Sequence, residues 1–196
     1  MLTKDETIQL AQITRFWFDH LTPEDWFVQA DPVDQQIRDQ FSHSYHHFKT
    51  RNLTDLDLTG DQILAAIILF DQMPRNMFRD SAKAFATDDL ALSLCFMALA
   101  NQHDLSMTDI RKTFLYLPLE HSEDLNNQAL SVSLFQQRTK LAPQIDYAVR
   151  HEVIIRRFGR FPHRNSILGR TSTPEEIDYL ANGGESFGGH KEPESS

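Results

Sequence analysis

The feature that most constrains this chain is the spacing of its apolar residues, which recur every three or four positions along most of the sequence. That spacing places them on one face of an α-helix, and no stretch shows sustained β-type alternation bounded by hairpin turns. The clearest stripe lies in a helix expected to begin near residue 31 and consists of Ile37, Phe41, Tyr45 and Phe48. The pattern predicts an all-α fold.

Helix-capping residues predict several helix boundaries. Thr59–Gln62 and Thr173–Glu176 have the form of capping boxes, in which the side chains at both ends of the motif satisfy unpaired backbone amides at a helix start. Gly159 follows an apolar helix expected to start near residue 143, and glycine is the residue best suited to a left-handed C-terminal cap.

Proline and serine predict further boundaries. Because proline lacks an amide hydrogen, we expect one helix to stop at Pro74 and another at Pro118. Ser122 is then expected to cap the next helix, with the two acids that follow it in the favourable first turn.

The length and composition fit a single globular domain. A chain of 196 residues with 40% hydrophobic residues can remove roughly 70% of its unfolded surface from water. We expect residues 1–183 to form one all-helical domain. Residues 184–196 are expected to form a disordered tail because they contain glycine, serine, proline, charged residues and a single phenylalanine.

Charge and hydropathy argue against several classes of partner. A net charge of -9 disfavours nucleic acid as the main partner. The longest apolar run, Ile63–Phe70, is far shorter than the roughly 20 residues that cross a bilayer. The first residues lack the pattern of a secretory signal, so we expect a cytoplasmic protein without a membrane partner. Cys95 lies among apolar residues and is expected to be a buried hydrophobe.

Two segments of the sequence resemble each other. Residues Phe70–Asn76 and Phe158–Asn165 both follow an apolar helix and combine a proline with an Arg-Asn pair, with Arg79 or Arg170 further along. Either a weak internal repeat of helical hairpins or chance explains this resemblance. Residues 141–170 contain six arginines but only two acids, which either attracts an anion or neutralises the acidic N-terminal part.

Several polar residues are candidates for chemistry, each with a structural alternative. A carboxylate near a helix C-terminus is disfavoured by the helix dipole, so Asp71 either pairs with Arg75 or Arg79 or belongs to a ligand or metal site. His121 and Glu123 are possible metal ligands or acid–base groups, although Glu123 also suits a helix start.

The second half of the chain adds a histidine and a crowded turn. His151 projects from a largely apolar helix face, as either a core histidine with one hydrogen bond or a functional group. Arg160, His163 and Arg164 crowd a helix exit, where their charges repel each other unless acids or a bound anion separate them. This crowding is the strongest sequence evidence for a site.

Four blocks of the sequence resemble the bacterial family known as domain of unknown function 924. They are Phe16–Phe18 with Trp26-Phe27; Leu69–Arg79 with Phe85–Asp88; Tyr116–Leu125 with Gln128; and His151 followed by Arg157–Asn165 and Leu168–Arg170. The resemblance extends over about residues 13–183. It implies stacked antiparallel helical hairpins in a right-handed superhelix like that of tetratricopeptide repeats, and it implies no known activity.

Three functions are compatible with these observations. The first is a binding module that holds an anionic small molecule or a peptide carboxylate in a pocket lined by Arg75, Asn76, Arg79, Arg160, Arg164 and Asn165, with His163 beside them. The second is a metal-dependent or acid–base hydrolase, with a divalent metal as a possible cofactor, that uses Asp71, His121, Glu123, His151 and His163. The third is a protein-interaction scaffold with an exposed apolar groove. The sequence leaves the oligomeric state open.

Overall fold

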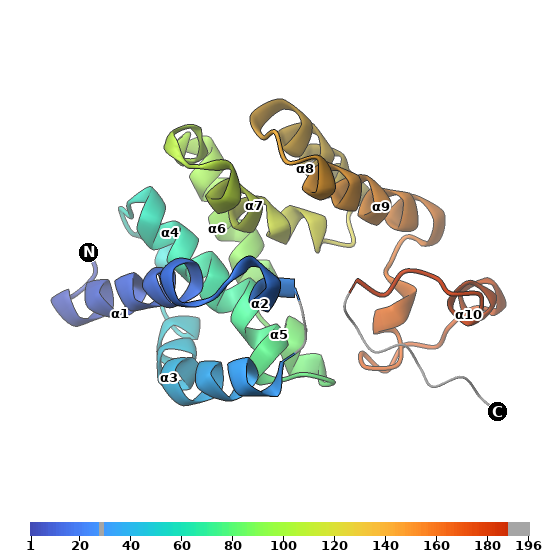
Figure 1. Cartoon of the computed structure of the whole chain (residues 1–196), viewed down its shortest axis with the longest axis horizontal. Helices are drawn as coiled ribbons and strands as arrows, with labels where there is room; N and C mark the ends of the chain where they lie inside the picture. The colour runs from blue at the N-terminus through green and yellow to red at the C-terminus, as the bar shows by residue number, and fades with distance from the viewer. Residues whose placement is uncertain (28–29, 188–196) are drawn as a thin grey trace.

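The computed structural model describes residues 1–27 and 30–187. The predicted all-α fold is confirmed, since these residues form helices joined by turns and loops and no strand (Figure 1). The α-helices are α1 Lys4–Arg15, α2 Pro23–Phe27, α3 Asp31–Lys49, α4 Gly60–Ile67, α5 Met73–Met77, α6 Asp88–Ala100, α7 Asp109–Glu120, α8 Leu125–Arg138, α9 Ala142–Phe158 and α10 Pro174–Ala181. Short 3₁₀ turns span Leu53–Asp55, Ala82–Phe85, His103–Ser106 and Pro162–Arg164, and π-helical turns span Phe16–His20 and Ile68–Gln72.

Consecutive helices pack against each other through much of the fold. The helix pairs α6 with α7, α7 with α8 and α8 with α9 are in contact, and the loops that join α7, α8 and α9 are short (Figure 1). In the first half, α4 contacts both α1 and α6, while α3 contacts α5. The expected superhelix like that of tetratricopeptide repeats remains a prediction.

The core is centred on α4 and the π-helical turn that follows it. Residues 63–70 are all buried, as expected from their unbroken apolar run. The stripe predicted for α3 also faces the core, because Ile37, Phe41, Tyr45 and Phe48 are each at most 4% exposed. Cys95 is fully buried, which confirms its interpretation as a small hydrophobe.

The predicted capping motifs are present. The side chains of Thr59 and Thr173 each accept a hydrogen bond from the backbone amide of the residue three positions later. The side chain of that later residue accepts one from the threonine backbone amide. Gly159 caps α9 with a φ angle of 70°, a left-handed conformation that suits glycine. These local signals were therefore sufficient to predict the starts of α4 and α10 and the end of α9.

Pro74 does not stop its helix, contrary to the prediction. The chain passes from α4 through the π-helical turn Ile68–Gln72 directly into α5, and Pro74 lies in the first turn of that helix. Proline is tolerated there because the first amides of a helix have no intrahelical partner. The π-helical turn thus allows the chain to continue as two joined helices.

The predicted boundary at Pro118 is also wrong. Pro118 lies inside α7, which continues to Glu120, and the next helix is capped by Asp124 instead of Ser122. The Asp124 carboxylate accepts hydrogen bonds from the backbone amides of Asn126 and Asn127. The extension of α7 brings Glu120 and His121 to its C-terminal end, where both face the candidate site.

The last described residues contact the helical body. Of the tail predicted to be disordered, residues 184–187 are described, and the Glu185 carboxylate accepts a hydrogen bond of 2.9 Å from Arg150 Nε. The Phe187 ring stacks on His151 with a centroid distance of 3.5 Å. Residues 188–196 of that predicted tail lie outside the described residues. No helix within the described part of the chain is both long and apolar enough to cross a membrane.

Candidate functional site

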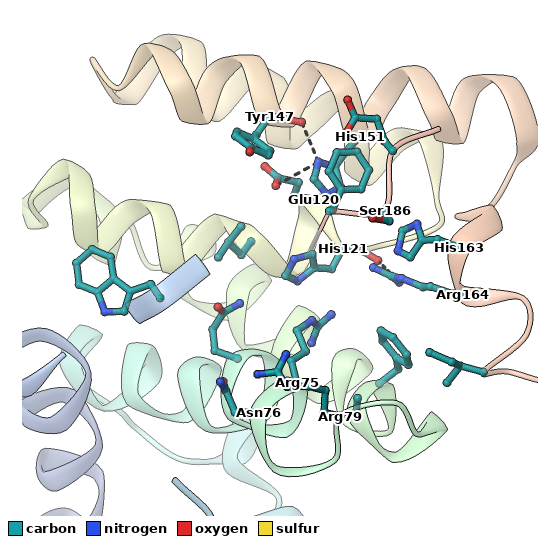
Figure 2. A pocket seen from close by; sticks show the side chains of 18 of the residues that line it. Arg75, Asn76, Arg79, Glu120, His121, Tyr147, His151, His163, Arg164 and Ser186 are labelled. Atoms are coloured by element: carbon teal, nitrogen blue, oxygen red, sulfur yellow. Dashed lines mark hydrogen bonds and ion pairs between the residues drawn. The ribbon is translucent and has the colours of Figure 1, made fainter. Parts of the chain in front are cut away.

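A cavity of about 960 Å³ lies between α5, α7, α9 and the turn at residues 162–164. This volume is in the range of pockets that enclose small molecules. Figure 2 shows Arg75, Asn76 and Arg79 on one side of the cavity and Glu120 and His151 on the other, with His121 between them and His163 and Arg164 beside it. Four segments that are distant in sequence therefore supply its polar lining.

His121 and Asp71 form a hydrogen-bonded pair at the cavity wall. The ring Nδ1 of His121 donates to Asp71 Oδ1 at 2.7 Å, and the Asp71 carboxylate is fully buried behind it. Burial raises the pKa of Asp71, but the Arg75 guanidinium and His121 lower it by more, so the net shift is downward. The pKa of His121 is lowered, mainly by burial. The charge of Asp71 opposes this shift, and the charge of Arg75 adds to it.

This pairing defines the chemistry available to the His121 ring. Asp71 is ionised and His121 is neutral at neutral pH, with its proton on Nδ1. The other ring nitrogen, Nε2, then carries a lone pair and can accept a proton. A buried aspartate that fixes a histidine in this tautomer is the arrangement found behind general bases in hydrolases.

Arg75 and Arg79 line the cavity, but acids already engage both guanidinium groups. Arg75 donates two hydrogen bonds of 3.0 Å to Asp88 and contacts Asp71 Oδ1 at 3.5 Å. Arg79 donates to both oxygens of Asp34 at 2.7 and 2.6 Å, and Asn76 Nδ2 donates to Asp34 at 2.7 Å. Much of the charge of these two arginines is therefore balanced within the fold.

Glu120 and His151 form a second pair of buried titratable groups. Glu120 Oε1 lies 3.4 Å from His151 Nδ1, which donates a hydrogen bond of 2.8 Å to the backbone carbonyl of Tyr147. Burial, with a contribution from the charge of Asp71, raises the pKa of Glu120 to about 8. Burial also holds the pKa of His151 well below its usual value. Both groups are therefore mainly uncharged at neutral pH.

Arg164 is the exception among the arginines of the cavity. It is 7% exposed, and its Nη1 donates a hydrogen bond of 2.9 Å to the backbone carbonyl of His121. Its Nε has no hydrogen-bond partner in the described part of the chain, and it forms no ion pair there. Burial and the nearby charge of Arg75 lower its pKa to about 10, so it remains a cation at neutral pH.

Aromatic rings and an uncharged histidine surround this cation. The Arg164 guanidinium carbon lies 4.3 Å from the centroid of Phe161 and 5.0 Å from that of Phe85. The neighbouring His163 has a buried Nδ1 without a partner among the described residues, and burial together with Arg164 lowers its pKa to about 3. Asp88 and Glu123 affect the pKa of Arg164 through their charge and form no ion pair with it. Their carboxylates are bonded to Arg75 and Arg170 instead.

Four of the candidate residues are outside the lining of this cavity: Asp71 lies behind His121, and the other three are Glu123, Arg160 and Asn165. Glu123 accepts hydrogen bonds of 2.5 and 3.0 Å from Arg170 and one of 2.8 Å from the Phe161 amide. Arg160 donates to both oxygens of Glu176 at 2.6 and 2.8 Å, and Asn165 donates to the same carboxylate at 3.2 Å. Glu123, Arg160 and Asn165 hold the segment that carries His163 and Arg164 in place.

The two similar segments have parallel contacts with one difference. Asn76 and Arg79 share the carboxylate of Asp34, just as Asn165 and Arg160 share that of Glu176. The parallel ends at the arginine that precedes each asparagine. Arg75 is bonded to Asp88, whereas the only hydrogen-bond acceptor of Arg164 among residues 1–27 and 30–187 is a backbone carbonyl.

Other contributors to the site were missed by sequence reasoning. Glu120 follows Tyr116 and Leu117 by four and three residues, and this spacing indicates the buried face of α7. Trp26, Gln72, Phe85, Phe135 and residues 183–187 also line the cavity, together with other residues of α7, α9 and the C-terminal segment. Asp34 and Asp88 pair with the arginines from helix starts, and nothing in their local sequence predicts these long-range contacts.

The possible metal cofactor has no cluster of ligands to support it in the described structure. Among residues 1–27 and 30–187, no group of three or more histidine, cysteine, aspartate or glutamate side chains is arranged to hold a metal ion.

Comparison with known proteins assigns a family. A solved structure described as a protein of unknown function, ATU0120 from Agrobacterium tumefaciens, is similar to this chain with a TM-score of 0.83 and 36% sequence identity. The match covers 91% of this chain and all of that structure. No functionally curated protein matches the sequence. Residues 13–184 match the family model described as bacterial protein of unknown function, DUF924, and the chain therefore belongs to that family.

Proposed function

We propose that this protein binds a small anionic molecule in the cavity and that Arg164 is the principal contact for its negative charge. The observation that carries the proposal is the buried guanidinium group of Arg164, which has no carboxylate partner among the described residues. A buried charge without a partner is costly, and proteins normally pair such groups. A ligand carboxylate beside Arg164 would supply the missing charge through charge-assisted hydrogen bonds.

The other polar residues suit supporting roles in binding. Arg75, Asn76 and Arg79 are held by acids and form a fixed polar wall across the cavity from Glu120 and His151. Neutral His163 and protonated Glu120 add hydrogen-bonding groups without a negative charge that would repel an anion. Arg160 and Asn165, which were candidates for direct contact, are assigned to support of the Arg164 segment.

The proposal is tested by thermal unfolding in the presence of small anions. We expect acetate, benzoate or another small carboxylate to raise the melting temperature of the wild type, because a ligand that binds only the folded state stabilises it by RT ln(1 + [L]/Kd), about 2.7 kcal/mol at a hundredfold excess over Kd. Arg164→Met should abolish this increase.

A matched control removes a different arginine. Arg156 has a side chain that is 61% exposed and pairs with Glu152 on the surface of α9, so Arg156→Met should leave the ligand effect unchanged. Equal ligand effects in the wild type and Arg164→Met would contradict the proposed role of Arg164.

A second candidate function is acid–base hydrolysis of a bound anion. The Asp71–His121 hydrogen bond of 2.7 Å favours it, since it leaves His121 Nε2 as a base at the wall of the cavity. In this scheme Nε2 accepts a proton from water as the water oxygen bonds to the carbonyl carbon of an ester or amide. The bond from that carbon to the leaving oxygen or nitrogen then breaks, and protonated Glu120 donates a proton to the leaving group.

His121→Gln separates the two candidates. A binding protein without hydrolytic activity predicts that wild type and variant both bind anions and neither turns over an ester or amide that carries a carboxylate. A hydrolase predicts turnover that falls at least a hundredfold in the variant, with binding retained. His43→Gln, on the exposed side of α3, is the control for loss of a histidine.

A further inference from the structure

The cavity extends well beyond the surroundings of Arg164. At its other end the lining includes Trp26 of α2, Thr113 and Leu117 of α7, and Phe135 of α8. None of these side chains carries a charge. Leu117 and Phe135 belong to the hydrophobic core, yet both also border the cavity. The cavity therefore has an apolar region as well as a cationic one.

The geometry of α7 separates these two regions. Thr113, Leu117 and His121 follow one another at intervals of four residues and so lie along one face of the helix. Eight residues of α-helix correspond to about 12 Å along the axis at 1.5 Å per residue. His121 lies at the cationic end, because its backbone carbonyl accepts the hydrogen bond from Arg164. Thr113 marks the opposite end.

Aromatic residues enclose the end near Thr113. The Trp26 ring centroid lies 5.1 Å from that of Phe114, the residue next to Thr113, and 6.1 Å from that of Phe18. The indole nitrogen of Trp26 donates a hydrogen bond of 2.8 Å to the backbone carbonyl of Trp17. Because the polar atom of the indole is used within the fold, the ring offers the cavity mainly apolar surface.

The titratable side chains along the cavity between Leu117 and His121 are mainly uncharged, so they do not disfavour an apolar ligand. Glu120 lies between Leu117 and His121 on α7 and contacts His151 of α9 at 3.4 Å, and both groups are mainly uncharged at neutral pH. The planar guanidinium fork of Arg164 matches a carboxylate. Arg75 and Arg79 are bonded to acids, so no second unpaired arginine in the described lining is available for the second charge of a phosphate monoester.

We propose that the ligand is an amphipathic carboxylate, whose head contacts Arg164 and whose apolar body extends along α7 to Trp26. This inference rests on the proposed anion-binding function and specifies the class of ligand. Straight-chain carboxylates of medium length and aryl-alkyl carboxylates have this combination of a single negative charge and an extended apolar body.

The test is a calorimetric titration of the full chain with a series of straight-chain carboxylates from acetate to octanoate. We expect affinity to rise about fourfold with each added methylene group, from the roughly 0.8 kcal/mol of a buried methylene. The rise should stop when the chain fills the apolar end. Leu117→Ala should reduce the gain for the longest acids and leave acetate unaffected.

Tryptophan fluorescence locates the apolar body independently. The chain contains two tryptophans, of which Trp17 is buried in the core and Trp26 lines the cavity. Octanoate should change the emission of the wild type, and Trp26→Phe, which retains an aromatic ring, should abolish the change while octanoate still binds. A persistent change in that variant would contradict the placement.

The outcomes separate this inference from the function on which it rests. If all acids bind equally and Arg164→Met abolishes their binding, the anion site is supported and the amphipathic ligand is wrong. If hexyl phosphate binds more tightly than heptanoate, the choice of a carboxylate head is wrong. If no acid in the series binds, both proposals fail.

Discussion

At the scale of single residues, the site combines charges that the fold neutralises with one that has no acidic partner in the described part of the chain. Asp71, Asp34 and Asp88 all engage arginines, whereas Arg164 is buried beside a backbone carbonyl and two aromatic rings. A stabilising role alone does not explain this arrangement, because a buried cation without an acid lowers stability. Function often retains such residues at a cost to the stability of the fold.

This cost can be measured without a ligand. Arg164→Met keeps the length of the side chain and removes the unpaired charge, so we expect its free energy of unfolding to equal that of the wild type or exceed it by about 1 kcal/mol. Chemical denaturation in a buffer of low ionic strength provides the measurement. A loss of more than about 2 kcal/mol would indicate that Arg164 is mainly a structural residue.

Glu120 predicts a specific dependence of stability on pH. Its pKa is about 8 in the folded protein, compared with an ordinary value of 4.5 in the unfolded chain. Between pH 4.5 and 8 the folded state therefore holds a proton that the unfolded state has lost. Stability contributed by this proton therefore falls as pH rises from 4.5 towards 8. Glu120→Gln, which mimics the protonated acid, should remove the fall.

The pH dependence due to Glu120 is best measured between pH 6.5 and 8. Histidines whose pKa is lowered in the fold change stability mainly below pH 6.5. Over that interval the wild type should lose up to about 2 kcal/mol relative to Glu120→Gln, at about 1.4 kcal/mol for each unit of pKa difference. Denaturation at a series of pH values is the measurement, with Glu175→Gln as a control because the Glu175 side chain is 62% exposed. Parallel curves for wild type and Glu120→Gln would refute the buried, protonated state.

At the scale of helices and turns, the sequence predicted some boundaries and not others for identifiable reasons. The capping boxes at Thr59 and Thr173 and the glycine cap of α9 depend on neighbouring residues only, so local sequence is sufficient. Pro74 and Pro118 were misleading, because a π-helical turn precedes one and core packing retains α7 around the other. Propensity is a weak signal where tertiary contacts compete with it.

Gly159 links a helix end to the site. Its φ angle of 70° turns the chain from α9 into the segment that carries His163 and Arg164. Gly159→Ala should cost about 1 kcal/mol in unfolding free energy, although a Cβ at this position meets no atom within 4 Å. Gly159→Asn should cost less, since asparagine tolerates the left-handed conformation. Equal stability of all three proteins in denaturation would argue against this backbone requirement.

At the scale of the whole molecule, the fold brings together residues that are distant in sequence. The sequence identified His121, His151, His163 and Arg164 as candidates from their types and local settings, and all four line one cavity. The hydrolase hypothesis grouped Asp71 with His121, fifty positions later, but the sequence did not predict the hydrogen bond between them, nor that Arg160 and Asn165 would bind Glu176. Such pairings depend on how helices stack, which local sequence does not encode.

The Asp71 carboxylate connects two halves of the chain and should be important for stability. It is fully buried and contacts Arg75 of α5 and His121 at the end of α7. Asp71→Asn should lower the free energy of unfolding by about 3 kcal/mol, because it leaves a buried ion-pair network incomplete. Asp61→Asn is the control, since Asp61 pairs with Arg111 while 77% exposed and should cost less than about 1 kcal/mol. Similar losses in the two variants would contradict this assignment.

The most direct test of the central claim is a nuclear magnetic resonance titration of the arginine side chains with octanoate. Arg164→Met assigns the Nε–H signal of Arg164, and the signals of Arg79 and Arg160, which are bonded to Asp34 and Glu176, serve as internal references. The account predicts a saturable shift of the Arg164 signal with much smaller changes in the two references. An Arg164 signal that stays constant while octanoate binds, or shifts no more than the references, would contradict it.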